Sequence, residues 1–177
     1  MRLASRDHLM KFTVMAMLVS MAAVISYFER FIPVLNIPGV KLGLANVVTL
    51  MALLLFSWKE AFLIAFARVL LVSFFGGGPV SLLYSATGAL FSLIAMRLAL
   101  FLKDRLISVV GVSIIGAVVH NTAQCMVLAI ILKSFDVAWG YYPILIYAAV
   151  VTGFITGYIC LHFSKAISYT PIVKKQD

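Results

Sequence analysis

Acidic residues are scarce in this chain, and their spacing excludes several kinds of catalytic site. Its 177 residues include only six aspartates and glutamates, and no two of them lie within four positions of each other. The paired carboxylates that would hold magnesium and a diphosphate are therefore missing. The sequence also lacks a Walker motif and a Gly-x-Ser-x-Gly nucleophile elbow. We therefore expect no enzymatic activity, no metal site and no cofactor bound by this chain.

Charge of either sign and cysteine are also sparse. Charged residues make up 11% of the chain and hydrophobic residues 64%, with a mean hydropathy of +1.12. A soluble domain of this size could not bury so much apolar surface, so lipid must be its main solvent. Cys125 and Cys160 lie inside apolar runs without metal-site spacing, and they imply no disulfide scaffold. We expect a single integral membrane domain over residues 1–177, without a soluble catalytic domain.

Apolar runs separated by Gly, Pro and charged residues predict an all-α membrane protein with six transmembrane helices. The expected spans are 9–28, 42–56, 61–75, 80–102, 106–132 and 138–163. The first apolar run is interpreted as an uncleaved span and not as a signal peptide. The second and third spans would reach only about 22 Å, less than a hydrocarbon core of ~30 Å. They are expected to tilt little, to lie partly inside the bundle, or to bend a loop into the membrane.

Basic residues predict the orientation. The formal charge is +8, which in a soluble protein would suggest nucleic acid. Here the basic residues lie mostly at span ends, which favours membrane topology and anionic lipid and excludes a nucleic-acid partner. Only Arg30, Lys41 and Lys133 fall on the side away from the termini. The protein is therefore expected in the plasma membrane with both termini in the cytoplasm.

A polar cluster interrupts the fifth predicted span. His120, Asn121 and Gln124 are spaced i, i+1 and i+4, so on a helix they form one patch. Gly116, one turn away, is expected to leave an opening beside the imidazole. Polar residues at such depth usually face a bundle interior or a cavity. Ligand binding is the favoured interpretation, and hydrogen bonding between helices is the alternative.

Arg68 lies about eight residues, roughly 12 Å, inside the third predicted span, too deep to reach the interface easily. Its charge needs a partner, and the few acids are badly placed; only Glu29, at the outer end of the first span, could bend inward. We favour Arg68 facing a polar cavity where an anionic ligand completes its contacts, with the ion pair as the alternative.

Two glycine-containing loops flank the expected cavity. The loop before the second span carries Lys41, with Asn46 one turn inside the span, and Gly39 and Gly43 permit a close backbone approach. Lys41 is either a site residue or an interface anchor. Loops Pro33–Lys41 and Gly76–Pro79 are expected to act as lids.

The start of the fourth span, just below the second loop, offers polar contacts from Ser81, Tyr84 and Ser85. The predicted substrate-binding residues are Lys41, Asn46, Arg68, Ser81, Tyr84, His120, Asn121 and Gln124.

Small residues recur on the first span. Ala16, Ser20 and Ala23 are spaced so that another helix could approach closely. This stripe is predicted to dock a partner, and packing within the chain is an equally good interpretation.

Three stretches together resemble one family. They are Pro38–Asn46 (PGVKLGLAN), Arg68 with Gly76–Gly78, and Gly116 with His120-Asn121-x-x-Gln124. From about residue 13 to about 161 the chain resembles the Gx transporter family, also labelled heptaprenyl diphosphate synthase component I. That family is grouped with the substrate-binding S components of energy-coupling factor (ECF) transporters.

The resemblance implies a six-helix S-component fold with a substrate pocket near the outer face. It also implies docking through the first span onto a membrane coupling subunit driven by two ATPase subunits, which alone use ATP. S components carry an Ala-x-x-x-Ala pattern on that span, and here Ala16 and Ser20 occupy it, with serine as a departure.

The preferred function is therefore a substrate-binding membrane subunit of an importer. Its small-molecule substrate would be an anionic vitamin, or a cofactor or isoprenoid-quinone precursor. The alternative is a non-catalytic membrane accessory subunit of a heptaprenyl diphosphate synthase. A stand-alone secondary carrier is disfavoured because no intramembrane carboxylate is expected, although His120 could titrate.

Overall fold

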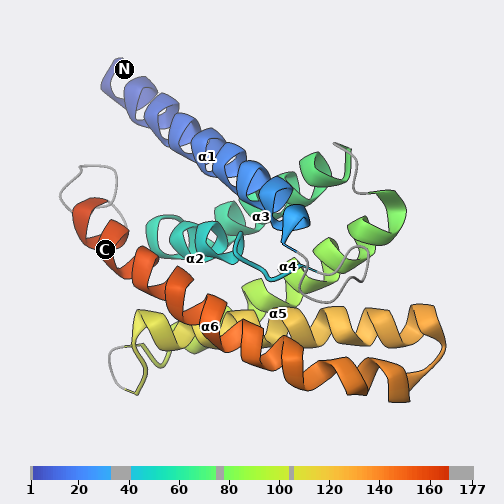
Figure 1. Cartoon of the computed structure of the whole chain (residues 1–177). Coiled ribbons are helices and arrows are strands. Elements are labelled where there is room, and N and C mark those ends of the chain that lie inside the picture. The colour runs from blue at the N-terminus through green and yellow to red at the C-terminus, as the bar shows by residue number, and fades with distance from the viewer. Residues whose placement is uncertain (1, 33–40, 75–77, 104–105, 168–177) are drawn as a thin grey trace.

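The computed structural model describes residues 2–32, 41–74, 78–103 and 106–167, which form helices joined by short turns and contain no strand (Figure 1). The six α-helices are α1 (Arg2–Phe28), α2 (Asn46–Leu55), α3 (Trp58–Val72), α4 (Gly78–Leu100), α5 (Val109–Leu132) and α6 (Phe135–Ile167). A short 3-10 helix, η1 (Glu29–Phe31), continues α1. The all-α prediction is confirmed for this part of the chain.

Four helices are long and apolar enough to cross a membrane: α1 over His8–Phe28, α4, α5, and α6 over Phe135–Ser164. The chain is therefore a multi-pass membrane protein. The second predicted span, 42–56, is too long, because the helix begins only at Asn46 and has ten residues, or about 15 Å. Gly43 has a φ of +81°, so the backbone turns before α2 begins. Six complete crossings stay a prediction.

The short α2 forms the centre of the bundle. Every residue of α2 except Leu54 is buried, and the helix contacts all five other α-helices. Apart from Asn46 and Thr49 its sequence, NVVTLMALLL, is apolar, as expected for a helix enclosed by others. Of the outcomes expected for this short segment, the structure shows a helix inside the bundle.

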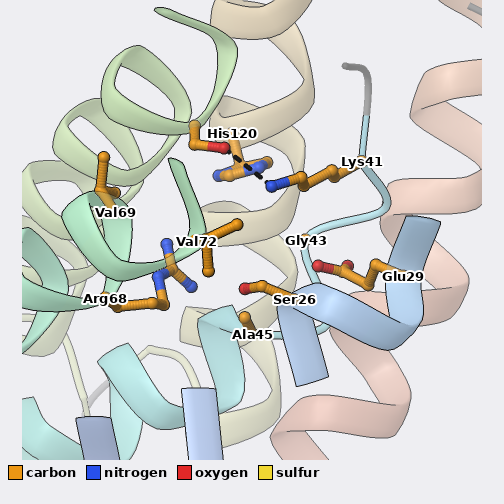
Figure 2. Close-up of a pocket in the computed structure, with 10 residues that line it drawn as sticks. Ser26, Glu29, Lys41, Gly43, Ala45, Arg68, Val69, Val72 and His120 are labelled. Atoms are coloured by element: carbon orange, nitrogen blue, oxygen red, sulfur yellow. Dashed lines mark hydrogen bonds between the residues drawn. The ribbon is translucent and has the colours of Figure 1, made fainter. Parts of the chain in front are cut away.

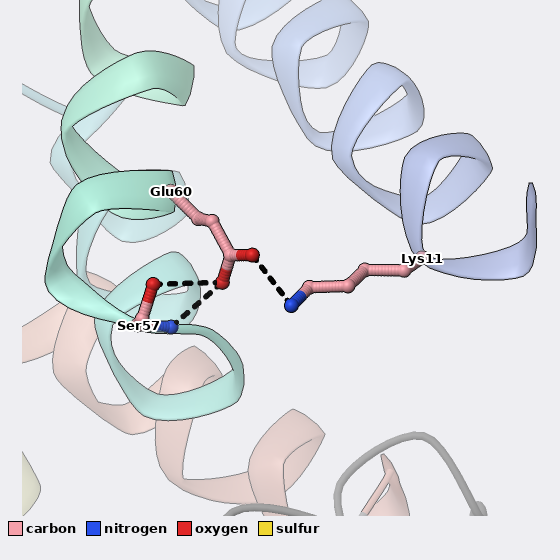
Figure 3. A network of polar contacts seen from close by, with 3 residues as sticks. All are labelled: Lys11, Ser57 and Glu60. Carbon is pink, nitrogen blue, oxygen red and sulfur yellow. Dashed lines mark hydrogen bonds and ion pairs between the residues drawn. The ribbon is translucent and has the colours of Figure 1, made fainter. Parts of the chain in front are cut away.

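Helix α3 is tied to α1 near the end where the chain begins (Figure 3). The Glu60 carboxylate accepts hydrogen bonds from the backbone N–H and hydroxyl of Ser57, both at 2.9 Å, in a capping box. Lys11 of α1 pairs with the other oxygen of Glu60 at 2.5 Å. The capping box explains why α3 begins at Trp58, three residues before the predicted span.

Helices α5 and α6 lie side by side and antiparallel (Figure 1). Glycines allow their close approach: a Cβ at Gly153 would lie 2.7 Å from the Cα of Ile114. A Cβ at Gly157 would lie equally close, 2.7 Å, to the Cα of Val110. The hydroxyls of Ser113 and Thr156 are hydrogen-bonded across the same contact at 2.8 Å. This rigid pair holds one wall of the site described next.

The predicted opening beside Gly116 is absent. The space next to Gly116 is filled by Met96 of α4, whose Cγ would lie 2.5 Å from an added Cβ. The glycine that makes room for the imidazole is instead Gly88 of α4, where an added Cβ would lie 2.6 Å from Cε1 of His120. Helical spacing along α5 could not reveal this, because the space belongs to the neighbouring helix.

Candidate functional site

A polar cavity lies where the end of α1, the segment before α2, and helices α3, α4 and α5 meet (Figure 2). It encloses about 280 Å³ of free space, including its open mouth. The region that the centre of a water molecule can reach is only about 10 Å³, enough for roughly one water. The lining residues are Ser26, Glu29, Lys41, Gly43, Ala45, Arg68, Val69, Val72, Ser85 and His120.

Arg68 enters this cavity from the last turn and a half of α3 and is 4% exposed. Among the described residues its guanidinium has no hydrogen bond and no ion pair within 4 Å; the one ion pair there is Lys11–Glu60. A buried charge without a partner costs on the order of several kcal/mol. The guanidinium therefore offers several N–H donors to whatever occupies the cavity.

Glu29 brings a carboxylate into the same cavity from η1. It is as buried as Arg68, and its Oε1 accepts a hydrogen bond from the backbone N–H of Leu44 at 2.5 Å. Burial raises the pKa of Glu29, while the Leu44 hydrogen bond and the charges of Arg68 and Lys41 oppose the rise. Glu29 thus bends inward, as an ion pair with Arg68 would require. The two side chains nevertheless line the cavity without a contact ion pair.

Lys41 is held inside the bundle at both its backbone and its side chain. Its backbone N–H donates to Oε1 of Gln124 at 3.0 Å, and its ammonium donates to the hydroxyl of Ser85, also at 3.0 Å. Only 8% of the residue is exposed. The interpretation of Lys41 as an interface anchor is therefore wrong. Ser85, which the predicted substrate-binding set omitted, is its partner on α4.

The bond from Lys41 also orients His120. A backbone N–H can only donate, so the Gln124 atom that it contacts must be the amide oxygen. The Gln124 amide nitrogen then donates to Nε2 of His120, 2.9 Å away, which must be an acceptor. The ring proton is therefore on Nδ1, on the side of the ring that faces Gly88. His120 is held as the neutral Nδ1–H tautomer.

Two glycines from different segments sandwich the imidazole. Gly88 lies against Cε1, and a Cβ at Gly43 would lie 3.1 Å from Cδ2. The same Gly43 position would be 2.9 Å from Nδ2 of Asn46, so the Asn46 amide also approaches this region. The expectation that Gly43 permits a close backbone approach is confirmed, and Gly39 lies outside the described residues.

The remaining predicted residues are placed differently. Asn46 is 3% exposed, and neither of its amide atoms has a partner in the described part of the chain. Asn121 donates to the carbonyl of Leu145 at 2.9 Å and so joins α5 to α6. Hydrogen bonding between helices was the alternative to ligand binding for this residue. Ser81 and Tyr84 are buried on α4 but do not line the cavity. Tyr84 packs instead in an apolar cluster between α4, α5 and α6.

Both expected lids fall largely outside the described residues. Residues 33–40 of the first loop and 75–77 around the second are not described, so their role as lids stays a prediction. Gly78, which begins α4, has a φ of +67°.

The small-residue stripe of α1 divides between two faces. Ala16 and Ser20 are exposed, and the Ser20 hydroxyl donates to the Ala16 carbonyl at 2.9 Å. Ala23 is half-buried, whereas Leu18, Ala22 and Ser26 form the buried face. Packing within the chain therefore uses this second set of residues. Ala16 and Ser20 stay available on the outer surface of the helix.

Comparison with known families places these features in a named group. Residues 18–163 match the heptaprenyl diphosphate synthase component I family, and the matched range covers most of the chain. The chain belongs to this family, whose members are membrane components of the Gx transporter type. Searches of curated proteins and of solved structures found no match.

Proposed function

We propose that this protein is the substrate-binding membrane subunit, of the S-component type, of an importer for a small anionic molecule. The observation that carries the proposal is Arg68: a buried guanidinium lines a cavity and has no ion pair among the described residues. A binding role makes use of a charge whose burial would otherwise only destabilise the fold. The proposed substrate is a vitamin, or a cofactor or isoprenoid-quinone precursor.

The orientation proposed is that of six helices with both termini in the cytoplasm of a plasma-membrane protein. Successive helices alternate in direction, and the start of α1 and the end of α6 lie at the same end of the bundle (Figure 1). Glu29 directly follows α1, Lys41 precedes α2, and Arg68 lies in the last turn and a half of α3, so the three lie toward the opposite end. The cavity would then open toward the outside, as import requires.

The proposed partners are a membrane coupling subunit and two ATPase subunits, which alone would use ATP. Helix α1 is the least covered of the four long apolar helices. Only 17% of its most apolar stretch is buried, against 39–44% in the other three. Ala16 and Ser20 on its outer face would let a partner helix approach closely. The binding subunit itself would need no cofactor.

The proposal is tested by affinity capture and by uptake. The tagged full chain, solubilised from its native membrane in mild detergent, should capture a membrane coupling protein together with ATPases. Cells carrying the Arg68→Gln variant should lose uptake of the substrate while the variant protein still accumulates in the membrane. Failure to capture ATPases, together with unchanged uptake, would contradict the proposal.

A second candidate follows from the family's description. As a component I, this chain could be a non-catalytic membrane accessory of a heptaprenyl diphosphate synthase. Its six acids include no closely spaced pair, so prenyl elongation would be carried out by the other component. Capture of a soluble, aspartate-rich prenyltransferase in the same experiment would favour this candidate over the importer.

A further inference from the structure

We propose that the cavity is built for a compact zwitterion: a ligand whose anionic group binds Arg68 and whose ammonium binds Glu29. The inference rests on the proposed function, because it describes the ligand of the same substrate site. It narrows the proposed substrate from any small anion to a molecule that also carries a positive group a few atoms from its negative group.

Two buried opposite charges stand apart in this cavity. Arg68 and Glu29 are each 4% exposed and line the same cavity. Their charges interact, yet no N–O distance between them is within 4 Å. Burying two charges costs far less when they touch and share hydrogen bonds. A pair held apart across a cavity is arranged for a molecule that completes both contacts.

The two charges come from different elements of the fold, and the Glu29 carboxylate is held in place. One oxygen of Glu29 is fixed by the Leu44 N–H, which ties the carboxylate to the segment before α2. Arg68 projects from α3, whose Val69 and Val72 line the same wall. Figure 2 shows the guanidinium on one side and the carboxylate on the other, with Ser26 between them. The separation of the two groups selects ligands by the distance between their own charges.

The charges that line the cavity nearly balance. Lys41 and Arg68 contribute two positive charges and Glu29 one negative charge, which leaves +1 with His120 neutral. The Lys41 ammonium already donates to Ser85. Arg68 is therefore the principal donor to an anionic group. Glu29 would repel a dianion placed beside it, and Arg68 and Lys41 would repel a simple cation.

The cavity size limits the ligand to a compact molecule. Its free space of about 280 Å³ includes the open mouth, and the enclosed part has room for roughly one water molecule, so binding must widen it. An amino-acid-like molecule, with one carboxylate and one amine, matches the charges. The headgroup of an amine-bearing phospholipid has the same paired chemistry, so the test must separate the two sources.

The test measures binding of matched probes to the purified full-length chain in detergent by isothermal titration calorimetry. One series pairs each of the twenty standard amino acids with its deaminated acid and its decarboxylated amine. A second series compares phosphoethanolamine with methyl phosphate and ethanolamine. At least one zwitterion should bind roughly 10-fold or more tightly than either of its single-charge partners, the effect of one charge-assisted hydrogen bond. A response confined to phosphoethanolamine would identify a lipid headgroup as the source.

Three variants assign the effect to the two charges. Glu29→Gln keeps an oxygen for the Leu44 N–H but removes the charge, so it should reduce the zwitterion's affinity to that of the acid. Arg68→Gln should abolish binding of both compounds. Glu60→Gln is the matched control, because this carboxylate pairs with Lys11 outside the cavity, and it should leave probe affinity unchanged.

The outcomes separate this inference from the function on which it rests. Equal affinity for an acid and its zwitterion, lost in Arg68→Gln, would overturn the inference and leave an anion importer standing. Absence of binding by every zwitterion would also overturn it. Capture of the coupling and ATPase subunits decides the importer role separately, because that experiment needs no ligand.

Discussion

The backbone N–H of Lys41 donates to the side-chain amide of Gln124, 83 residues further along the chain. Because the same amide donates to His120, one side chain fixes both the segment before α2 and the tautomer of the imidazole. Gln124 is fully buried, so neither group can turn to water when the amide is removed. This residue joins the cavity wall to the loop that leads into the central helix.

Gln124→Ala should therefore lower stability more than its size implies. The change removes the acceptor of the Lys41 N–H and the donor to His120 Nε2, at a cost of roughly 1–3 kcal/mol for each buried group left unsatisfied. The expected result is a clear fall in thermal midpoint in detergent. Met126→Ala is the control, because Met126 is on the same helix and half-exposed. Equal midpoints for the two variants would contradict the network.

Gly88→Ala should displace the imidazole. An added Cβ would lie 2.6 Å from Cε1 and 2.8 Å from Nδ1 of His120, closer than side chains tolerate. Overpacking of this kind costs typically about 1–3 kcal/mol. The thermal midpoint should fall, and adding His120→Ala should remove much of the penalty in a double-mutant cycle. Gly140→Ala, where an added Cβ meets nothing within 4 Å, serves as the control. Additive effects at Gly88 and His120 would show that the two do not touch.

Much of the fold was predictable, because apolar runs and their breaks set the helices. Where the prediction failed, the cause was local chemistry that hydropathy does not show. Helix α2 begins late because Gly43 turns the backbone, and α3 begins early because Ser57 and Glu60 cap it. The short apolar sequence of α2 was consistent with burial, but its contact with all five other α-helices depends on tertiary packing.

The site was only partly accessible to sequence reasoning. Depth in the membrane drew attention to Arg68 and His120, and both line the cavity. The contributions of Glu29 and Ser85 depend on how separate segments meet in space. The scarcity of acids was a usable signal for Glu29, since any acid near the outer end of α1 was the natural partner of an internal arginine.

Glu29 gives stability a specific dependence on pH. Its pKa is raised, chiefly by burial, so the folded state binds this proton more tightly than the unfolded chain does. Its contribution to stability should therefore fall as the pH rises from 4.5, the ordinary value, through the higher folded-state pKa. Glu29→Gln removes this dependence. Thermal midpoints of both proteins over a pH series should diverge as the pH rises, with the variant the more stable. A constant difference at every pH would contradict this assignment.

Glu60 should show the opposite dependence, in a lower pH range. Burial alone would raise its pKa, but the hydrogen bonds from Lys11 and Ser57 outweigh it and lower the pKa below 4.5. The folded state then binds this proton less tightly, so its contribution is present above pH 4.5 and is lost as the pH falls further. The ion pair is partly exposed and contributes at most about 1 kcal/mol. Glu60→Gln should therefore lower the midpoint slightly at neutral pH and have no effect in strong acid.

Added bulk on the outer face of α1 should block a partner without harming the fold. Ala16 is exposed, so Ala16→Phe places the ring in lipid and leaves the thermal midpoint of the isolated protein unchanged. Close helix packing in membranes depends on small residues, so the same ring should prevent a partner helix from approaching. Capture of the proposed coupling subunit should fall at least several-fold.

Two further variants complete this test. Val150→Phe adds similar bulk to an exposed position of α6, and it should preserve capture because that helix is not the proposed docking element. Ala22→Phe introduces the ring on the buried face of α1, where exposure is 0%, and it should destabilise the protein through overpacking. Full capture by the Ala16→Phe variant would place the docking surface elsewhere. Loss of capture by Ala16→Phe alone, at an unchanged midpoint, would assign it to the face that carries Ala16 and Ser20.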